Sequence, residues 1–272
     1  MAIYADQTGR SLELPTAPRR IVSTVPSQTE LLHDLGLNEQ VVGITAYCVH
    51  PSHWLKEKEV IGGTKDLQID KIKGLKPDLI VANKEENIRE QIEKLATDIP
   101  VYVSDIKSPR DTLAFVNDLG EILGVAERSK KLTDGIEKSL DDFGNHNIEG
   151  SCCYFIWKEP YMVVSNDTFI QSMVDLTGLH NPVKHNDQRY PQITLDQLST
   201  LAPDVVLLSS EPYRFTTADL HDFGHRFPES VIKLVDGEMM SWYGSRLIKG
   251  LRYVKRLRNE LDLVLKGRRN GS

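Results

Sequence analysis

Short apolar runs alternate with amphipathic stretches along most of the chain. RIVSTV at 20–25, DLIVAN at 78–83 and DVVLLSS at 204–210 have the length and β-branched content of buried strands. The stretch 85–95 between two such runs is polar with spaced Ile and Leu and predicts a helix. Strands that alternate with helices predict a parallel sheet with helices on both faces.

The middle of the chain has a different pattern. Residues 109–143 predict two helices, 112–123 and 126–143, without an intervening strand. The second is strongly charged, with Leu132, Ile136 and Leu140 at a spacing of four. Such a narrow apolar stripe is typical of a helix on the outside of two lobes, and at 1.5 Å per residue this one reaches roughly 27 Å. The strand and helix pattern restarts at 151.

These patterns predict an α/β protein made of two Rossmann-like lobes. Each lobe has a central, mostly parallel sheet, and a single long helix bridges them. The expected boundaries are 1–124 for the first lobe, 125–144 for the bridging helix and 145–272 for the second lobe.

Two stretches 126 positions apart support a duplicated unit. LQIDKIKGLKPDLIV occupies 67–81 and ITLDQLSTLAPDVVL occupies 193–207. Without a gap, five positions agree: Asp70 with Asp196, Ile72 with Leu198, Leu75 with Leu201, Pro77 with Pro203, and Asp78 with Asp204. A period of half the chain indicates one copy in each lobe and is too long for a solenoid.

Each copy predicts a short helix followed by a strand. Thr194 and Gln197 form a candidate capping box, and Ser27 with Glu30 forms another at the start of an earlier helix. Asp70 and Asp196 fall in the first helical turn, where the helix dipole favours a carboxylate by about 0.3–1 kcal/mol. This is a structural explanation of both residues, but burial does not require them, so a functional role stays open.

Composition excludes several classes of protein. Of 272 residues, 40% are apolar and 26% are charged, and the net charge of −6 argues against a nucleic-acid binder. No apolar run approaches the roughly 20 residues that span a bilayer. Three cysteines cannot form a disulfide framework, and we expect Cys152 and Cys153 to be buried residues of a strand. The N-terminal residues lack a signal-peptide pattern, so the protein is either cytoplasmic, or it has lost a signal and gained Met1.

Catalytic motifs are absent from the sequence: it has no P-loop, no G-x-S-x-G and no G-x-G-x-x-G. We therefore expect no enzyme. Cys48, His50 and His53 are spaced as C-x-H-x-x-H, which suits zinc or iron. Pro51 interrupts that stretch and no second cluster supplies further ligands, so we expect neither a protein metal site nor a cofactor. The rival hypothesis is a chelatase-like enzyme that uses His50, His53 and Glu159.

The repeated segment, the opening PRRIVSTVPSQTELLHDLGL, the strand VVGIT and the long middle helix together resemble one family. They are similar to the substrate-binding proteins of ABC importers for cobalamin and ferric siderophores, the class with a helical backbone. The resemblance covers about residues 6–265. It implies two α/β lobes bridged by a rigid helix with a ligand cleft between them. It also implies a monomer that delivers a metal chelate, containing cobalt or iron, to an ABC permease dimer.

Aromatic residues follow the predicted strands, where doubly wound sheets bind ligands. Tyrosine and tryptophan offer rigid contact area to a bulky planar ligand, and arginine pairs with carboxylates or phosphate. Loop anchoring is the structural alternative, and for Trp54 and Tyr213 the two interpretations are balanced. The candidate ligand-binding residues are Tyr47, His50, Trp157, Tyr161, Arg189, Tyr190, Trp242, Tyr243 and Arg246.

The resemblance also implies one permease-docking acid on each lobe. Asp70 and Asp196 occupy those positions, where the family usually has Glu, and Glu85 and Glu211 are the second choice. The family's cobalamin binders tend to have an aromatic residue near Thr64, which this chain lacks. A corrinoid remains the first-choice ligand, followed by haem or a ferric siderophore. A periplasmic or cell-envelope importer component is expected if a signal was removed, and a cytoplasmic carrier or sensor if Met1 is the native start.

Overall fold

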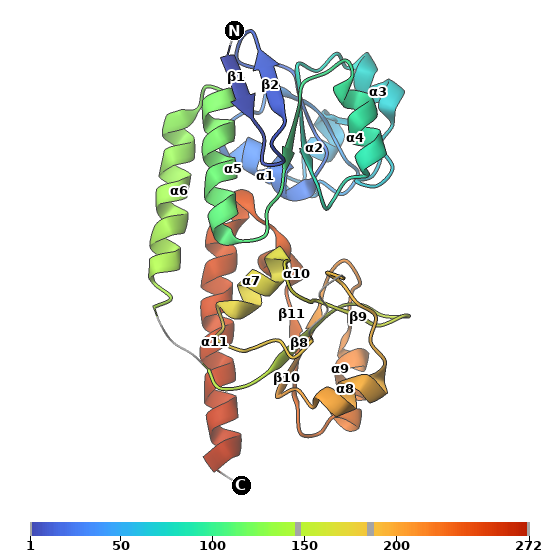
Figure 1. The fold of residues 1–272 in the computed structure, drawn as a ribbon, viewed down its shortest axis with the longest axis vertical. Coiled ribbons are helices and arrows are strands. Elements are labelled where there is room, and N and C mark those ends of the chain that lie inside the picture. Colours follow the sequence, from blue (N-terminus) through green and yellow to red (C-terminus); the bar gives the residue numbers. More distant parts are fainter. Residues whose placement is uncertain (1, 145–147, 184–187, 271–272) are drawn as a thin grey trace. The chain divides into compact units, whose positions relative to one another are not determined.

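The computed structural model describes residues 2–144, 148–183 and 188–270. The fold is mixed α/β with largely parallel sheets, which confirms the predicted fold class (Figure 1). The chain divides into two compact units. Unit 1 comprises Met1–Ile106, Arg110–Ile136 and Tyr243–Arg246, and unit 2 comprises Lys107–Pro109, Glu137–Trp242 and Leu247–Ser272.

The strands and helices of both units have the following bounds. The strands are β1 (Ala2–Ala5), β2 (Ser11–Leu14), β3 (Ile21–Ser23), β4 (Val41–Ile44), β5 (Glu59–Val60), β6 (Leu79–Asn83), β7 (Val101–Ser104), β8 (Cys152–Trp157), β9 (Met162–Val163), β10 (Val205–Ser209) and β11 (Val231–Val235). The helices are α1 (Pro26–Asp34), α2 (Trp54–Glu57), α3 (Ile69–Gly74), α4 (Arg89–Ala96), α5 (Pro109–Ile122), α6 (Ala126–Asp141), α7 (Phe169–Asp175), α8 (Leu195–Leu201), α9 (Thr217–Arg226), α10 (Gly237–Ser241), the 3-10 turn η1 (Gly244–Arg246) and α11 (Leu247–Asn270).

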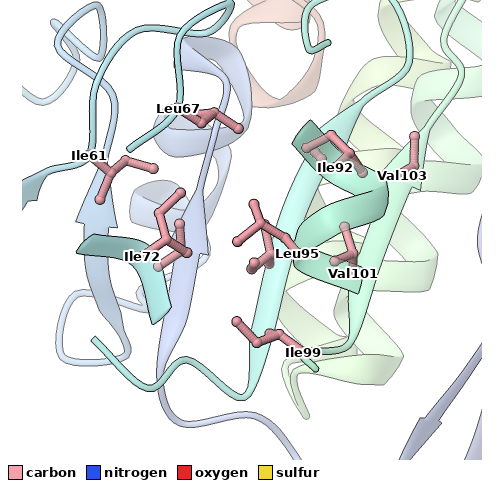
Figure 2. Close-up of a cluster of buried hydrophobic side chains, with 11 residues drawn as sticks. Ile61, Leu67, Ile72, Ile92, Leu95, Ile99, Val101 and Val103 are labelled. Carbon is pink, nitrogen blue, oxygen red and sulfur yellow. The ribbon is translucent and has the colours of Figure 1, made fainter. Parts of the chain in front are cut away.

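Unit 1 contains a five-stranded parallel sheet in the order β5-β4-β3-β6-β7 and the antiparallel hairpin β1-β2. Ile72 of α3 and Ile92 and Leu95 of α4 are at most 5% exposed and pack with the sheet side chains (Figure 2). Val101 and Val103 of β7 complete that cluster. The apolar positions of the first repeat copy are therefore structural.

Unit 2 contains a four-stranded sheet in the order β11-β10-β8-β9. β11, β10 and β8 are parallel, and β9 pairs antiparallel with β8. Leu198 of α8 is fully buried with Phe155 and Val206 of the sheet. It occupies the position of Ile72 in the second copy of the repeat.

The second Asp of each repeat copy fixes the start of a neighbouring strand. Asp78 accepts backbone N–H bonds from Arg19 and Arg20, directly before β3. Asp204 accepts the backbone N–H of Ser151, directly before β8, at 2.7 Å. Each carboxylate accepts hydrogen bonds from backbone N–H groups that would otherwise be unpaired at the start of a strand. This gives the Asp of each Pro-Asp pair a structural role.

The predicted middle helices form α5 and α6, and the division between the units falls within α6, after Ile136. Ile136 is fully buried, while Leu132 and Leu140 are half-buried. The closing helix begins later than the predicted 245–265 because residues 244–246 form η1 in unit 1, and it extends to Asn270.

One predicted capping box is confirmed and the other is wrong. The Thr194 hydroxyl accepts a hydrogen bond from the backbone N–H of Gln197, and the Gln197 side-chain oxygen accepts one from the backbone N–H of Thr194. Helix α1 instead begins with Val25 at its N-cap and Pro26 as its first residue, without a side-chain cap. Ser27 lies inside the helix, and Glu30 is turned to an arginine 216 positions away. The local sequence could not show that Glu30 would pair with Arg246 instead of forming the capping box.

Candidate functional site

Two aromatic rings meet at the carboxyl edge of the sheet in unit 2. Trp157 ends β8, and Tyr213 lies four residues after β10, its parallel neighbour. Their ring centroids are 5.8 Å apart and the rings are inclined by 64°. Trp157 is 40% exposed, which is high for a residue of this size. The pair places an accessible indole where α/β sheets bind ligands.

A cluster of aromatic side chains supports this pair. Tyr213 packs on Phe215 at a centroid distance of 4.9 Å, and Phe155 of β8 contacts both Phe215 and Phe223. Tyr161, in the turn between β8 and β9, contacts Phe155 at 5.8 Å and is half-buried. Edge-to-face pairs of this kind hold their rings in fixed orientations. The exposed Trp157 and the half-buried Tyr213 therefore pack on a rigid aromatic cluster.

An ion pair between Lys158 and the buried carboxylate of Asp219 lies next to the aromatic cluster. Lys158 Nζ lies 2.6 Å from Asp219 Oδ1, and Asp219 also caps α9 through Thr216. Burial by itself would raise the pKa of Asp219, but hydrogen bonds from Lys158 and Thr216 bring that pKa below its usual value. The same hydrogen bond raises the pKa of Lys158. Sequence reasoning missed this pair because its members are 61 positions apart.

Arg189 and Tyr190 are half-buried in the loop that precedes the second repeat. The Arg189 Nε donates to the backbone carbonyl of Asp167 at 2.7 Å, and its own carbonyl accepts the backbone N–H of Ser165. Arg189 therefore ties together two loops of unit 2. Its predicted contact with a ligand anion stays a prediction.

Trp242 directly follows α10 and is the last residue of unit 2 before the chain passes into unit 1 for residues 243–246. Its indole Nε1 donates to Glu211 Oε1 at 2.8 Å, and the side chain is 9% exposed. Glu211 follows β10, and burial raises its pKa, an effect that hydrogen bonds from Ser241 and Trp242 oppose. Glu211 is half-buried, which does not favour its second-choice role as a docking acid.

Tyr243 and Arg246 belong to unit 1, although they lie one and four positions after Trp242 in the sequence. The Tyr243 hydroxyl accepts a bond from Gln28 Nε2 at 3.2 Å. The Arg246 guanidinium makes two hydrogen bonds to the Glu30 carboxylate, at 2.7 and 2.8 Å. Tyr243 is 5% exposed and Arg246 is 6% exposed. Their contact with a ligand stays a prediction that this burial does not favour.

In unit 1 the loop after β4 carries the exposed aromatic side chain. Tyr47 is 63% exposed, and its ring lies so close to Gly63 that an added Cβ there would be 3.1 Å from the Tyr47 Cε2. His50 is half-buried and precedes a cis peptide bond to Pro51. Trp54 is 1% exposed and is a core residue, with the Lys58 ammonium 5.2 Å from its ring centroid.

The C-x-H-x-x-H stretch does not converge on one point. Cys48 is fully buried and its Sγ contacts the hydroxyls of Thr29 and Thr45. The His53 side chain is 55% exposed and lies 4.0 Å from Glu57. Within residues 2–144, 148–183 and 188–270, no group of three His, Cys, Asp or Glu side chains is arranged to hold a metal ion.

The first-choice docking residues occupy equivalent places in the two repeat helices. Asp70 is exposed in the first turn of α3, and Asp196 in the first turn of α8. The Asp196 side chain is 93% exposed and lies 3.1 Å from Arg226. Glu85 is half-buried in the loop after β6.

The chain matches a known protein family. Residues 21–233 match the periplasmic binding protein family. The vitamin B12-binding protein of Pectobacterium carotovorum is 26% identical over 202 residues, or 72% of each chain, and that of Yersinia pestis is 27% identical over 206 residues, or 73% of this chain and 72% of the relative.

Solved structures show the same fold. The periplasmic vitamin B12 binding protein BtuF of Vibrio cholerae has a TM-score of 0.80 at 21% identity, covering 91% of this chain and 99% of that one. A periplasmic haem binding protein from Pseudomonas aeruginosa has a TM-score of 0.74 at 19% identity, covering 87% and 91%. In the described part of this chain, no helix combines the length and apolar character needed to cross a membrane.

Proposed function

Since the chain belongs to the periplasmic binding protein family, we propose that it captures a metal chelate and delivers it to an ABC permease. A corrinoid is the first-choice ligand, followed by haem or a ferric siderophore. The family consists of substrate-binding transport proteins, so the chain is a binding protein rather than an enzyme. It carries a transported ligand instead of a resident cofactor.

The observation that carries the proposal is the accessible Trp157–Tyr213 pair at the carboxyl edge of the unit 2 sheet. Tyr161 packs on Phe155 of the supporting cluster, and in unit 1 the exposed Tyr47 occupies the loop after β4. Flat rings held in place bind a planar macrocycle with little loss of side-chain entropy. The vitamin B12-binding relatives support a corrinoid over the other chelates.

A fluorescence titration with cyanocobalamin tests the ligand. We expect saturable quenching at micromolar or lower concentration, and the Trp157→Ala and Tyr213→Ala variants should each weaken binding about tenfold, as central aromatic contacts do. Tyr4→Ala, on the hairpin β1-β2, is the matched control and should bind as the wild type does. If haemin or a ferric siderophore quenches and cyanocobalamin does not, the ligand assignment changes and the binding function stands.

Delivery to a permease is the second part of the proposal. Asp70 and Asp196 offer one exposed carboxylate on each unit, which suits two positive sites of a permease dimer. We expect a monomer located in the periplasm or cell envelope.

Replacing both residues with Ala should abolish cellular uptake and leave ligand affinity unchanged. The Asp98→Ala/Asp222→Ala variant, which also removes one exposed acid from each unit, is the control and should transport normally. Loss of ligand affinity in the first variant would contradict a docking role, and normal uptake would refute it.

A further inference from the structure

The carboxylate of Glu211 joins two segments of unit 2 that carry candidate ligand residues. Glu211 lies two residues after β10 and two residues before Tyr213. Its Oε1 accepts a bond from Trp242 Nε1 at 2.8 Å and from Ser241 Oγ at 3.1 Å. Trp242 is therefore attached to the loop of Tyr213 through this one carboxylate oxygen.

The backbone of Glu211 is itself fixed to the sheet. The Ser209 hydroxyl donates to the Glu211 carbonyl at 2.6 Å, and the buried Tyr154 hydroxyl donates to Ser209 Oγ at 3.0 Å. Gly237 lies against the side chain, because a Cβ added there would be 2.4 Å from the Glu211 Cγ. The position of the carboxylate is thus fixed by the Ser209 hydrogen bond to the Glu211 backbone and by the packing of the Glu211 side chain against Gly237.

Among the residues that the structure describes, Glu211 is not the anionic member of an ion pair. Across the part of the chain that the structure describes, Glu211 forms no salt bridge, and the charged groups that face it are the carboxylates of Asp236 and Glu238. A half-buried carboxylate with acidic neighbours costs stability unless hydrogen bonds compensate. Here the compensating donors are an indole N–H and a hydroxyl. A charged acceptor holds an indole N–H more strongly than a neutral one.

We propose that Glu211 is a positioning residue that fixes the Trp242 indole relative to the Tyr213 loop for ligand binding. This inference rests on the proposed function, because Trp242 and Tyr213 act only if unit 2 binds a ligand at this edge. The role differs from permease docking, which requires an exposed acid.

Indole N–H resonances of the ¹⁵N-labelled full chain test the anchor without a ligand. The chain has three tryptophans, so Trp242→Phe assigns the signal. In wild type we expect the Trp242 resonance to shift with pH as Glu211 takes up a proton. Glu211→Gln should remove that pH dependence and keep the resonance sharp, because its amide oxygen still accepts the bond. Glu211→Ala should broaden the resonance and leave those of Trp54 and Trp157 unchanged.

Binding of cyanocobalamin and haemin then separates positioning from a structural role. For whichever probe the wild type binds, Glu211→Ala should weaken affinity about tenfold, Glu211→Gln should restore most of it, and the exposed control Glu229→Gln should have no effect. An unchanged Trp242 resonance in Glu211→Ala overturns the anchor. A shifted resonance with unchanged affinity overturns the positioning role. If the wild type binds neither of these probes nor a ferric siderophore, the proposed function and the positioning role both fail, whereas the indole resonances still decide whether Glu211 anchors Trp242.

Discussion

The buried ion pair between Glu30 and Arg246 makes the sharpest prediction about stability. It joins α1 to η1 within unit 1, across 216 positions of sequence. The side chains are 6% exposed for Arg246 and 8% exposed for Glu30, and two short hydrogen bonds connect them. Arg246→Ala removes one partner and leaves a carboxylate buried without its cation. Breaking a buried pair in this way costs about 3–5 kcal/mol.

Urea unfolding followed by circular dichroism measures this loss. With a slope near 2 kcal/mol per molar urea, the loss lowers the midpoint of the unit 1 transition by about 2 M. Arg226→Ala is the matched control, since Arg226 pairs with an Asp196 side chain that is 93% exposed. That surface pair should contribute at most about 1 kcal/mol.

Replacing both members of the buried pair with Met gives a second arm of the experiment. Because apolar residues of similar size remove the unpaired charge, Glu30→Met/Arg246→Met should be more stable than Arg246→Ala. If Arg246→Ala costs no more than Arg226→Ala, the reasoning about burial is refuted. If the double Met variant is less stable than the single Ala variant, the unpaired carboxylate is not the source of the loss.

Three further predictions concern caps, packing and pH. Thr194→Ala should cost about 1 kcal/mol in thermal unfolding because it removes an observed capping box, and no loss would show that this cap does not stabilise α8. Ile72→Ala should cost about 2–5 kcal/mol in urea, since its side chain is fully buried, and a smaller loss would mean that the site collapses. The pKa of Asp219 is lower when folded, so its contribution to stability is present above its usual pKa and is lost as pH falls toward the folded value. Asp219→Asn should therefore flatten the dependence of the free energy of unfolding on pH below about pH 4, the ordinary range of an aspartate. An unchanged pH dependence would show that Lys158 does not stabilise the folded state through this carboxylate.

The repeat illustrates which structural features were predictable from sequence. The apolar positions at Ile72 and Leu198 and the cap at Thr194 are local, so their spacing predicted the helices that the structure contains. The Pro-Asp pairs were recognised as a signal, but their partners were not. Asp78 and Asp204 bind backbone donors 53 to 59 positions away, and a repeat in the sequence does not say what each copy contacts.

The candidate site divides in the same way. The exposed aromatics at Tyr47 and Trp157 were predictable because they follow apolar strands, and the carboxyl ends of parallel strands share one edge of a sheet. Trp242, Tyr243 and Arg246 lie in one stretch of the sequence and were all predicted to bind the ligand. The chain passes from unit 2 to unit 1 within it, so the last two side chains are buried against α1 and α5 of unit 1.

By itself, the sequence determined the fold class, the alternation of the main strands with helices, the duplicated helix and strand, and the absence of known catalytic motifs, but not helices α2, α9 and α10. These features depend on periodicity and on residues close together in the chain. Only the tertiary structure decided that Glu30 pairs with Arg246, that Lys158 pairs with Asp219, and that Glu211 holds Trp242. A polar side chain is satisfied by whichever donor or acceptor the packed units bring within about 3 Å, and that choice is made by packing between distant segments.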